Sequence, residues 1–359
     1  MKLINESGLW TTGPVPALVP VVAVLEVSGA VLSWSIEALS DPPVISFTDA
    51  ERADWMWRVL GEAGHVAVVE ALRDRDPTEV IELSSVSVLP GSTDVLRRLA
   101  LGHWFRRWWP ASRRDGIAVL DRSVLDAELA VLTAAAEDYF TDDTLDADVA
   151  GLLAPHGAAL GSHRDPRVDL LVARCRELAD EIGLQWDSPD IGAARREDYA
   201  LAAGSGDEPR PPGAIAFGSV TIAWSDVPPG IFDAAEQNLG WAVVAEDAAV
   251  TARVRAAISG PESSEGIPVS LRCGVFHAAG VLDADGGAVL PVFDAQERPA
   301  EEVPAWNADW SAMRVSVGAG GAGEPSGLRD RVRAFARSRL ARPADDAFLA
   351  ELLAAESDY

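Results

Sequence analysis

The hydrophobic spacing changes once along this chain of 359 residues, and that change constrains the fold more than any motif does. Before residue 187, apolar residues recur every three or four positions over long stretches, which is typical of amphipathic helices. After residue 212 the apolar runs are short, rich in β-branched residues and punctuated by Gly and Pro, as in β-strands. The stretch 187–212 is rich in Pro and Gly and has no period. We therefore expect an α+β protein with its main boundary in this stretch.

The N-terminal part is predicted to combine a small β-hairpin or sheet with a helical bundle. Apolar runs within 21–36 flank Ser28-Gly29, which favours a hairpin, and a strand at 80–89 is expected to pair with it. The sequence from Thr48 to Glu51 has the form of a capping box, which predicts the start of a helix. Helical spacing predicts a bundle of four further helices, at 94–108, 112–139, 144–160 and 166–182.

The C-terminal part is predicted to contain an antiparallel β-sandwich-like domain. Short strand patterns follow one another from residue 214 to residue 317, and the run from Asp283 to Gly287 has the composition of a tight hairpin turn. Helices are expected at 328–340 and 343–355. The predicted division is an α-rich α+β domain at 1–186, a linker at 187–212, the sandwich-like domain at 213–318, and a Gly-rich linker with C-terminal helices at 319–359.

Charge and missing motifs exclude several classes of function. The net charge of -26 repels a polyphosphate backbone, so a nucleic-acid partner is not expected. Lys2 is the only lysine, which excludes an internal Schiff-base lysine and a P-loop. The sequence also lacks a dinucleotide-binding glycine pattern, a nucleophile elbow and a His-Glu-x-x-His motif. No cofactor is therefore predicted.

The cysteines and the N-terminal residues favour a cytoplasmic location. Cys175 and Cys273 are too few for a disulfide framework or a closed zinc site, which favours a reducing compartment. Residues 1–20 lack the order of regions found in a signal peptide. The apolar run at 15–25 contains two prolines and is too short to span a bilayer. We therefore expect a cytoplasmic protein without a membrane partner.

The segment 103–114 concentrates arginine and tryptophan. Such residues can anchor a protein partner, bind a phosphate or stack on a base. The alternative is that the tryptophans pack inside the helical bundle while the arginines pair with the many acidic residues. The candidate partner-binding residues are Trp104, Arg106, Arg107, Trp108, Trp109, Arg113 and Arg114.

Two aromatic turns are further candidates for a recognition surface. The first, at 224–233, contains Pro228-Pro229-Gly230 between aromatic residues, and the second, at 306–310, contains two tryptophans. Loops of this kind can form binding surfaces, but aromatic side chains that close a hydrophobic core are the favoured interpretation.

Two groups of residues are candidates for chemistry. His156 and His163 are seven positions apart with Asp165 nearby, and these three are the candidate metal ligands, although a glycine between the histidines interrupts the helix. Cys273 and His277 would share one face of an uninterrupted strand and could then pair as a nucleophile and its base. Ordinary surface or buried roles are favoured for both groups.

These observations predict a function without fixing a reaction. We expect a non-catalytic component for protein–protein interaction, or a scaffold, in an intracellular bacterial system, with a protein as its partner. The alternatives are a hydrolase that uses carboxylates or a metal, and a sensor of a small molecule or nucleotide.

Overall fold

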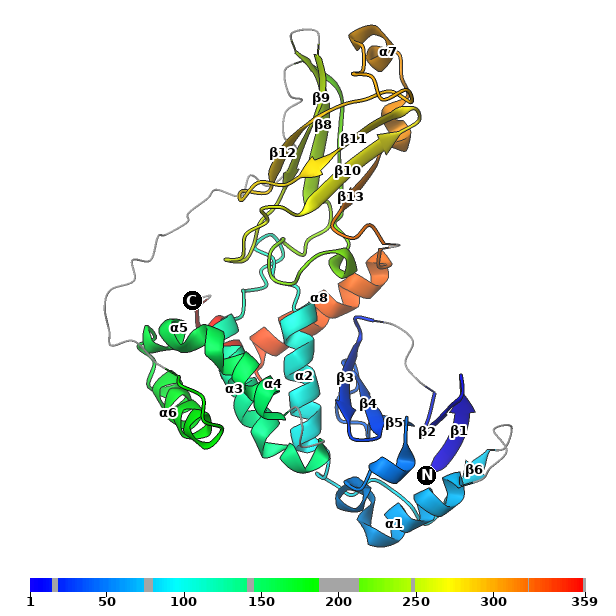
Figure 1. The fold of residues 1–359 in the computed structure, drawn as a ribbon, viewed down its shortest axis with the longest axis vertical. Helices are drawn as coiled ribbons and strands as arrows, with labels where there is room; N and C mark the ends of the chain where they lie inside the picture. Colours follow the sequence, from blue (N-terminus) through cyan, green and yellow to red (C-terminus); the bar gives the residue numbers. More distant parts are fainter. Residues whose placement is uncertain are drawn as a thin grey trace. The chain divides into compact units, whose positions relative to one another are not determined.

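The computed structural model describes residues 1–14, 19–73, 80–140, 145–186, 213–246, 249–321 and 323–357 (Figure 1). Helices and antiparallel sheets both occur, which confirms the predicted α+β class. Within these ranges no helix combines the length and the apolar character that crossing a bilayer requires. The predicted linker at 187–212 lies outside the described residues.

The chain divides into two compact units, and each unit is assembled from separate segments. Unit 1 comprises residues 1–106, 120–195 and 338–359, and unit 2 comprises residues 107–119 and 196–337. The short segment 107–119 therefore belongs with the strand-rich unit. The domain boundaries expected from the sequence stay a prediction. They divide the chain into consecutive segments, whereas each of these two units combines segments that are not consecutive.

Unit 1 contains a six-stranded antiparallel sheet with the strand order β3-β4-β5-β2-β1-β6. The predicted hairpin is confirmed, since Val27 pairs with Ala30 across Ser28-Gly29. Gly29 has a φ of 73°, and a Cβ there would collide with the Asp49 carbonyl, so glycine is required at this turn. The strands are β1 (Lys2–Glu6), β2 (Leu9–Thr11), β3 (Val22–Val27), β4 (Ala30–Ser35), β5 (Val44–Phe47) and β6 (Ile81–Glu82).

The strand expected at 80–89 is much shorter than predicted. Only β6 is extended, and it pairs with β1 rather than with the hairpin, as the register Lys2–Glu82 shows. The N-terminal amino group donates to the Leu83 and Val86 carbonyls at 2.7 Å each, so the chain after β6 bends around the N-terminus.

The helix start expected at Thr48 to Glu51 is a single 3₁₀ turn. Asp49 accepts a hydrogen bond from the Glu51 backbone N–H and caps η1 (Ala50–Arg52). The longer helix, α1 (Met56–Leu72), begins one turn later and is kinked at Gly61, where φ is 74° and ψ is 163°. Glycine tolerates this conformation, so the kink follows directly from the sequence.

The other helices of the N-terminal half agree with the helical spacing except in two places. The helix predicted at 144–160 is interrupted by a 3₁₀ turn at Ala154–His156. The helix predicted at 112–139 is wrong over its first ten residues, because Ser112 and Ile117 form a β-bridge and Gly116 has a φ of 64°. The helix begins only after Asp121, whose carboxylate accepts from the Ser123 and Val124 backbone N–H groups. The helices are α2 (Asp94–Trp108), α3 (Arg122–Ala135), α4 (Leu145–Leu153), α5 (Gly157–Gly161) and α6 (Pro166–Glu181).

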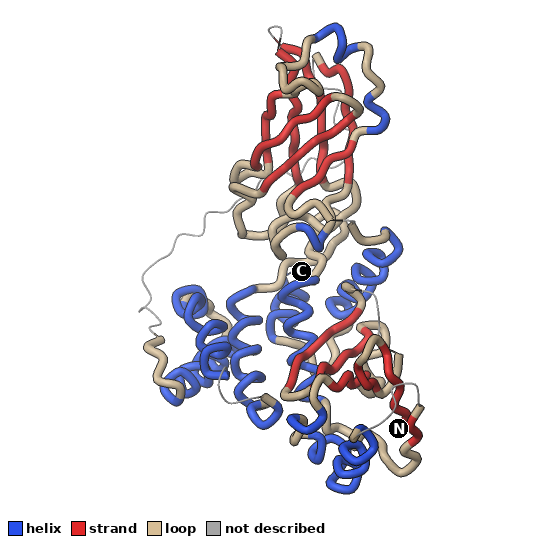
Figure 2. The backbone as a smooth tube through the Cα atoms, turned by 45° about the vertical axis from the view of Figure 1, so that its right-hand side comes forward, coloured by secondary structure: helices blue, strands red, loops and turns tan. Residues whose placement is uncertain are grey.

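Unit 2 contains two antiparallel sheets (Figure 2). Side chains of both sheets belong to one hydrophobic core. Val243 and Val254 of the four-stranded sheet and Leu271 and Ala278 of the three-stranded sheet belong to the same buried cluster. The sheet orders are β12-β9-β8-β7 and β11-β10-β13. The strands are β7 (Ala214–Val220), β8 (Leu239–Glu246), β9 (Ala249–Ala256), β10 (Pro268–Cys273), β11 (Phe276–Val281), β12 (Gly287–Pro291) and β13 (Arg314–Val317).

The turn from Asp283 to Gly287 is tight, but it does not close a hairpin. The Asp283 backbone N–H donates to the Gly287 carbonyl at 2.8 Å, and Gly286 has a φ of 78°. The strands on either side belong to different sheets, because β11 pairs with β10 and β12 pairs with β9. The predicted hairpin is therefore wrong, and the turn carries the chain from one sheet to the other.

Three helices follow the strand-rich stretch or interrupt it. They are α7 (Glu302–Trp306), α8 (Ser326–Ala341) and α9 (Leu349–Ser357). The predicted helix at 328–340 corresponds to α8, and the one predicted at 343–355 begins six residues late, at Leu349.

Candidate partner-binding site

An aromatic hollow lies within unit 2, where the end of α2 meets the turn after β7. Its walls come from two segments, 107–110 and 222–238, which are distant in the sequence. The hollow has a volume of about 400 Å³, including the space open to solvent. The residues with rings in its lining are Trp108, Trp109, Trp224, Pro228, Pro229 and Phe232. We call this the aromatic hollow.

Arg107 joins the two segments. Its guanidinium donates to the Trp224 carbonyl at 3.1 Å and to the Ser225 carbonyl at 3.3 Å. The same group lies 4.2 Å from the centre of the Trp108 ring, which is a cation–π geometry. Burial lowers the pKa of Arg107, and the Glu324 carboxylate opposes that shift. Arg107 therefore serves mainly to position the two walls.

Buried polar groups lie next to the lining of the aromatic hollow. The Asp233 carboxylate, 6% exposed as a residue, accepts from the Arg113 backbone N–H at 2.9 Å and from the Ala235 N–H at 2.9 Å. The Asn238 side chain accepts from the Ile222 N–H at 2.8 Å and donates to the Asp233 carbonyl at 2.6 Å. These bonds satisfy groups that would be costly to bury unpaired, and they limit movement of the walls.

The Pro228-Pro229-Gly230 turn is restrained from both sides. Its two prolines have restricted backbone angles. Gly260 approaches the Gly230 backbone so closely that a Cβ at position 260 would collide with it. The Ser259 N–H also donates to the Ile231 carbonyl at 2.9 Å. The turn therefore presents its rings in one arrangement.

A network of arginines and carboxylates supports Trp224 in unit 2. The guanidinium carbons of Arg329 and Arg333, which are 7% and 3% exposed as residues, each lie 5.9 Å from the Trp224 ring centre. Both arginines pair with Glu236 at 3.0 Å, and Glu324 accepts from the Trp224 backbone N–H at 3.1 Å. The Trp224 indole therefore lies beside two arginines whose charges are balanced by neighbouring carboxylates.

The structure divides the seven candidate partner-binding residues among different environments. Trp104 is 3% exposed in unit 1 and donates to the Pro20 carbonyl, so its expected role in a partner surface is not supported. Arg106, also in unit 1, pairs with the buried Asp126. Of the other five candidates, three are in the lining of the aromatic hollow, namely Arg107, Trp108 and Trp109. The remaining two, Arg113 and Arg114, are exposed on the segment that follows it.

The three candidate metal ligands have separate partners. His156 contacts Asp126 and His163 contacts Asp121, each at 2.9 Å, whereas Asp165 forms an ion pair with Arg167 at 2.7 Å. Throughout the described ranges no group of three or more His, Cys, Asp or Glu side chains could hold a metal ion. The geometry therefore gives no support to the predicted metal site.

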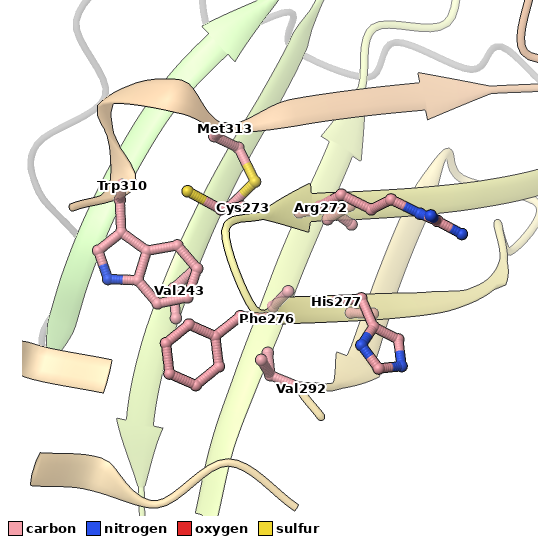
Figure 3. A pocket seen from close by; sticks show the side chains of 11 residues that line it. Val243, Arg272, Cys273, Phe276, His277, Val292, Trp310 and Met313 are labelled. Atoms are coloured by element: carbon pink, nitrogen blue, oxygen red, sulfur yellow. The ribbon is translucent and has the colours of Figure 1, made fainter. Parts of the chain in front are cut away.

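A second hollow lies at one edge of the sandwich core in unit 2. Its volume is about 180 Å³, including the space open to solvent. Its lining combines apolar side chains of both sheets with Cys273, Arg272 and His277 (Figure 3). The rings of Phe276 and Trp310 stack there with centres 5.2 Å apart. The Cys273 sulfur donates to the Asp309 carbonyl, and burial raises the pKa of its thiol.

The predicted strand that would align Cys273 with His277 does not exist. Gly274 and Val275 form a tight turn, so the two residues lie on neighbouring strands, and His277 pairs in register with Arg272. The His277 ring points away from the Cys273 sulfur (Figure 3). A buried thiol with a raised pKa, turned away from the neighbouring imidazole, is unsuited to nucleophilic catalysis.

Sequence reasoning missed the buried charges of unit 1. Asp126, Glu128 and Glu351 are 2%, 8% and 0% exposed. Asp126 and Glu128 could have been noticed, because they alternate with apolar residues in the part of α3 that faces the core. Their partners come from other helices, and the sequence gives no signal for those pairings.

The buried environment of Glu128 can be tested by measuring the free energy of unfolding as a function of pH. Burial raises its pKa to about 7, although the Leu349 and Ala350 N–H groups and the Arg98 charge oppose the shift. The folded chain therefore holds this proton more tightly than the unfolded chain. The resulting stabilisation, up to roughly 3 kcal/mol, is complete below pH 4.5 and is lost as the pH rises through 7.

We expect Glu128→Gln to remove that pH dependence. Relative to the wild type, its free energy of unfolding should rise by up to roughly 3 kcal/mol as the pH rises from 4.5 through 7, because glutamine, like the protonated carboxyl, carries no charge to bury. Urea unfolding at several pH values measures both curves under the same conditions, so the other titrating groups cancel in the difference. Parallel curves for the two proteins would contradict the raised pKa.

No protein-family model, curated protein or solved structure matches this chain. Its function must therefore be inferred from the geometry of its own residues.

Proposed function

We propose that this chain is a non-catalytic protein-binding component, and that the aromatic hollow receives an apolar side chain, preferably proline, from an acidic segment of a partner protein. The observation that carries this proposal is the meeting of two aromatic segments, 107–110 and 222–238, in one hollow that is open to solvent. The partner would act in the same compartment as this chain, and we propose the cytoplasm because both cysteines are free thiols.

An apolar anchor fits the lining of the aromatic hollow. Indole and pyrrolidine rings offer apolar faces, and partner side chains that fill such pockets dominate the binding energy of protein interfaces. Aromatic-lined grooves also recognise proline-rich segments, which lose little conformational entropy on binding.

The polar groups near the aromatic hollow favour a protein over a small molecule as its ligand. A small-molecule site needs several polar groups that converge on the ligand. Here the Arg107 guanidinium already donates to two carbonyls, and both polar atoms of the Asn238 side chain are hydrogen-bonded. Specificity would then come from shape and from charge at the rim.

The rim gives the partner its expected charge. Arg113 and Arg114 are exposed on the segment that continues from the wall of the aromatic hollow. Arg114 donates to the Glu236 backbone carbonyl, which leaves its charge uncompensated by that contact. Acidic residues beside the anchor would complement these two arginines and speed association.

A displayed library of random peptides tests the proposal, and it can be used before the partner is identified. We expect the selected peptides to share an apolar or proline anchor next to Asp or Glu, and to bind the full chain in a fluorescence anisotropy titration. Trp108→Ala should weaken binding about tenfold or more, because it removes one wall of the aromatic hollow.

Trp306→Ala is the matched control for this experiment. Trp306 is 47% exposed on α7 and its indole donates to Glu302 at 3.2 Å, so its loss should leave the titration unchanged. Circular dichroism would establish that both variants are folded. Peptides that bind Trp108→Ala as tightly as the wild type, or selections without a shared anchor, would exclude the aromatic hollow as the binding site.

A further inference from the structure

A second cluster of charged residues surrounds the Asp126 carboxylate in unit 1. Asp126 lies on α3 with its side chain 3% exposed. Arg106 at the end of α2 approaches it at 2.7 Å, Arg122 at the start of α3 at 3.0 Å, and His156 of η3 (Ala154–His156) at 2.9 Å. Three side chains from three elements thus converge on one carboxylate.

The cluster carries more positive than negative charge. Two guanidinium groups share the single carboxylate of Asp126, which leaves an excess of one positive charge before any imidazole is counted. Asp121, the neighbouring carboxylate, contacts His163 and the Ser123 hydroxyl, the latter at 2.6 Å, and not the two arginines; its charge and that of Asp148 reduce the positive excess at longer range. An uncompensated charge that is partly removed from water is costly, and a bound anion would relieve that cost.

The pKa shifts of nearby groups agree with a positive local electrostatic potential. Burial and the Arg106 charge lower the pKa of His103, with Asp126 and Asp148 opposing. Burial alone would raise the pKa of Asp126, but the hydrogen bond from His156 and the two arginine charges lower it. Asp126 therefore stays ionised and keeps the two guanidinium groups beside each other.

Both guanidinium groups remain accessible to an anion. The Arg106 and Arg122 side chains are 30% and 38% exposed. Arg122 also donates to the Arg106 carbonyl at 3.1 Å, which restrains its position. Guanidinium groups match the geometry of phosphate and carboxylate oxygens, and restrained arginines lose little entropy when they bind.

We propose that Arg106 and Arg122 form a binding site for a small anion that carries a phosphate group, with Asp126 as the residue that positions them. The overall charge of -26 repels anions at long range, but at physiological salt this repulsion is screened beyond about 8 Å. At shorter range the charges of Arg106 and Arg122 dominate the interaction with an anion. A compact phosphate is therefore favoured over an extended polyanion. This site is independent of the aromatic hollow.

Calorimetric titration of the full chain with inorganic phosphate, at constant ionic strength, tests the proposal. We expect saturable binding that Arg122→Lys weakens and that Arg122→Gln weakens further, by about tenfold, because each step removes charge or fork geometry. Phenyl phosphate and malonate titrations distinguish a phosphate monoester from free phosphate and from a carboxylate.

Arg167→Gln is the matched control. Arg167 is 40% exposed and its charge is already shared with Asp165 and Glu356, so its removal should leave phosphate binding unchanged. Circular dichroism shows which variants are folded, and Arg122→Lys decides the outcome if Arg122→Gln is not. Absence of saturable phosphate binding to the wild type, or equal affinities in the wild type and the folded Arg122 variants, would overturn the proposal.

Discussion

Replacing Arg339 with alanine is expected to lower the free energy of unfolding by about 3–5 kcal/mol. Arg339 and Glu351, both in unit 1, form a buried bidentate pair with distances of 2.7 and 2.6 Å. Glu351 is 0% exposed and also accepts from the Phe348 backbone N–H at 2.9 Å. Without the guanidinium, its carboxylate would remain buried with most of its charge uncompensated.

A surface ion pair of similar geometry provides the control. Arg167 reaches Asp165 and Glu356 at 2.7 and 2.6 Å, but these groups are far more exposed. Arg167→Ala should therefore cost less than about 1 kcal/mol. Urea unfolding followed by circular dichroism compares the two variants, and hydrogen exchange locates the loss of protection.

The double variant Arg339→Met with Glu351→Leu tests two contributions to the free energy of unfolding separately. One is the destabilisation by an unpaired buried carboxylate, and the other is the net stabilisation by the ion pair. Replacement of both partners by apolar residues should recover most of the stability that Arg339→Ala loses. Similar losses for Arg339→Ala and Arg167→Ala would show that the pair is not buried as described.

Replacing Trp310 with alanine is expected to cost about 3–5 kcal/mol in unit 2. Trp310 is 8% exposed, stacks on Phe276 with ring centres 5.2 Å apart, and donates to the Ala305 carbonyl at 2.9 Å. Its removal would enlarge the hollow at the edge of the sandwich core and remove the indole donor from that carbonyl (Figure 3). Trp310→Phe should recover part of the loss, because it restores the stacked ring.

The neighbouring tryptophan of the same loop is the control for this prediction. Trp306 is 47% exposed, and Trp306→Ala should change the free energy of unfolding by no more than about 0.5 kcal/mol. Denaturant unfolding followed by circular dichroism measures both. Equal effects of the two substitutions would contradict the assignment of Trp310 to the core.

Trp306 and Trp310 show a limit of what can be predicted from the sequence alone. The aromatic loop at 306–310 predicts either a recognition surface or a core-closing role, and the structure assigns the second to Trp310 while leaving Trp306 exposed. Nothing in the local pattern distinguishes the two, because burial depends on which side of the loop meets the sheets.

The candidate partner-binding residues show the same limit. Arginine and tryptophan at 103–114 stand out as one group in the sequence, yet Trp104 is buried in unit 1 whereas Trp108 lines the aromatic hollow in unit 2. The opposite wall, at 222–238, stands out separately as a stiff aromatic turn. Their meeting could not be foreseen from one sequence.

Local sequence pattern was sufficient to predict the hairpin of β3 and β4, the helices α2 and α6, and the succession of short strands in unit 2. Periodicity and capping residues act over a few positions, so they are visible in a single chain. The tertiary structure alone decided that 107–119 joins unit 2, that Asp283–Gly287 connects two sheets, and that Asp126, Glu128 and Glu351 are buried. These outcomes depend on packing between residues that are distant along the chain, where the free energy of many contacts outweighs any local preference.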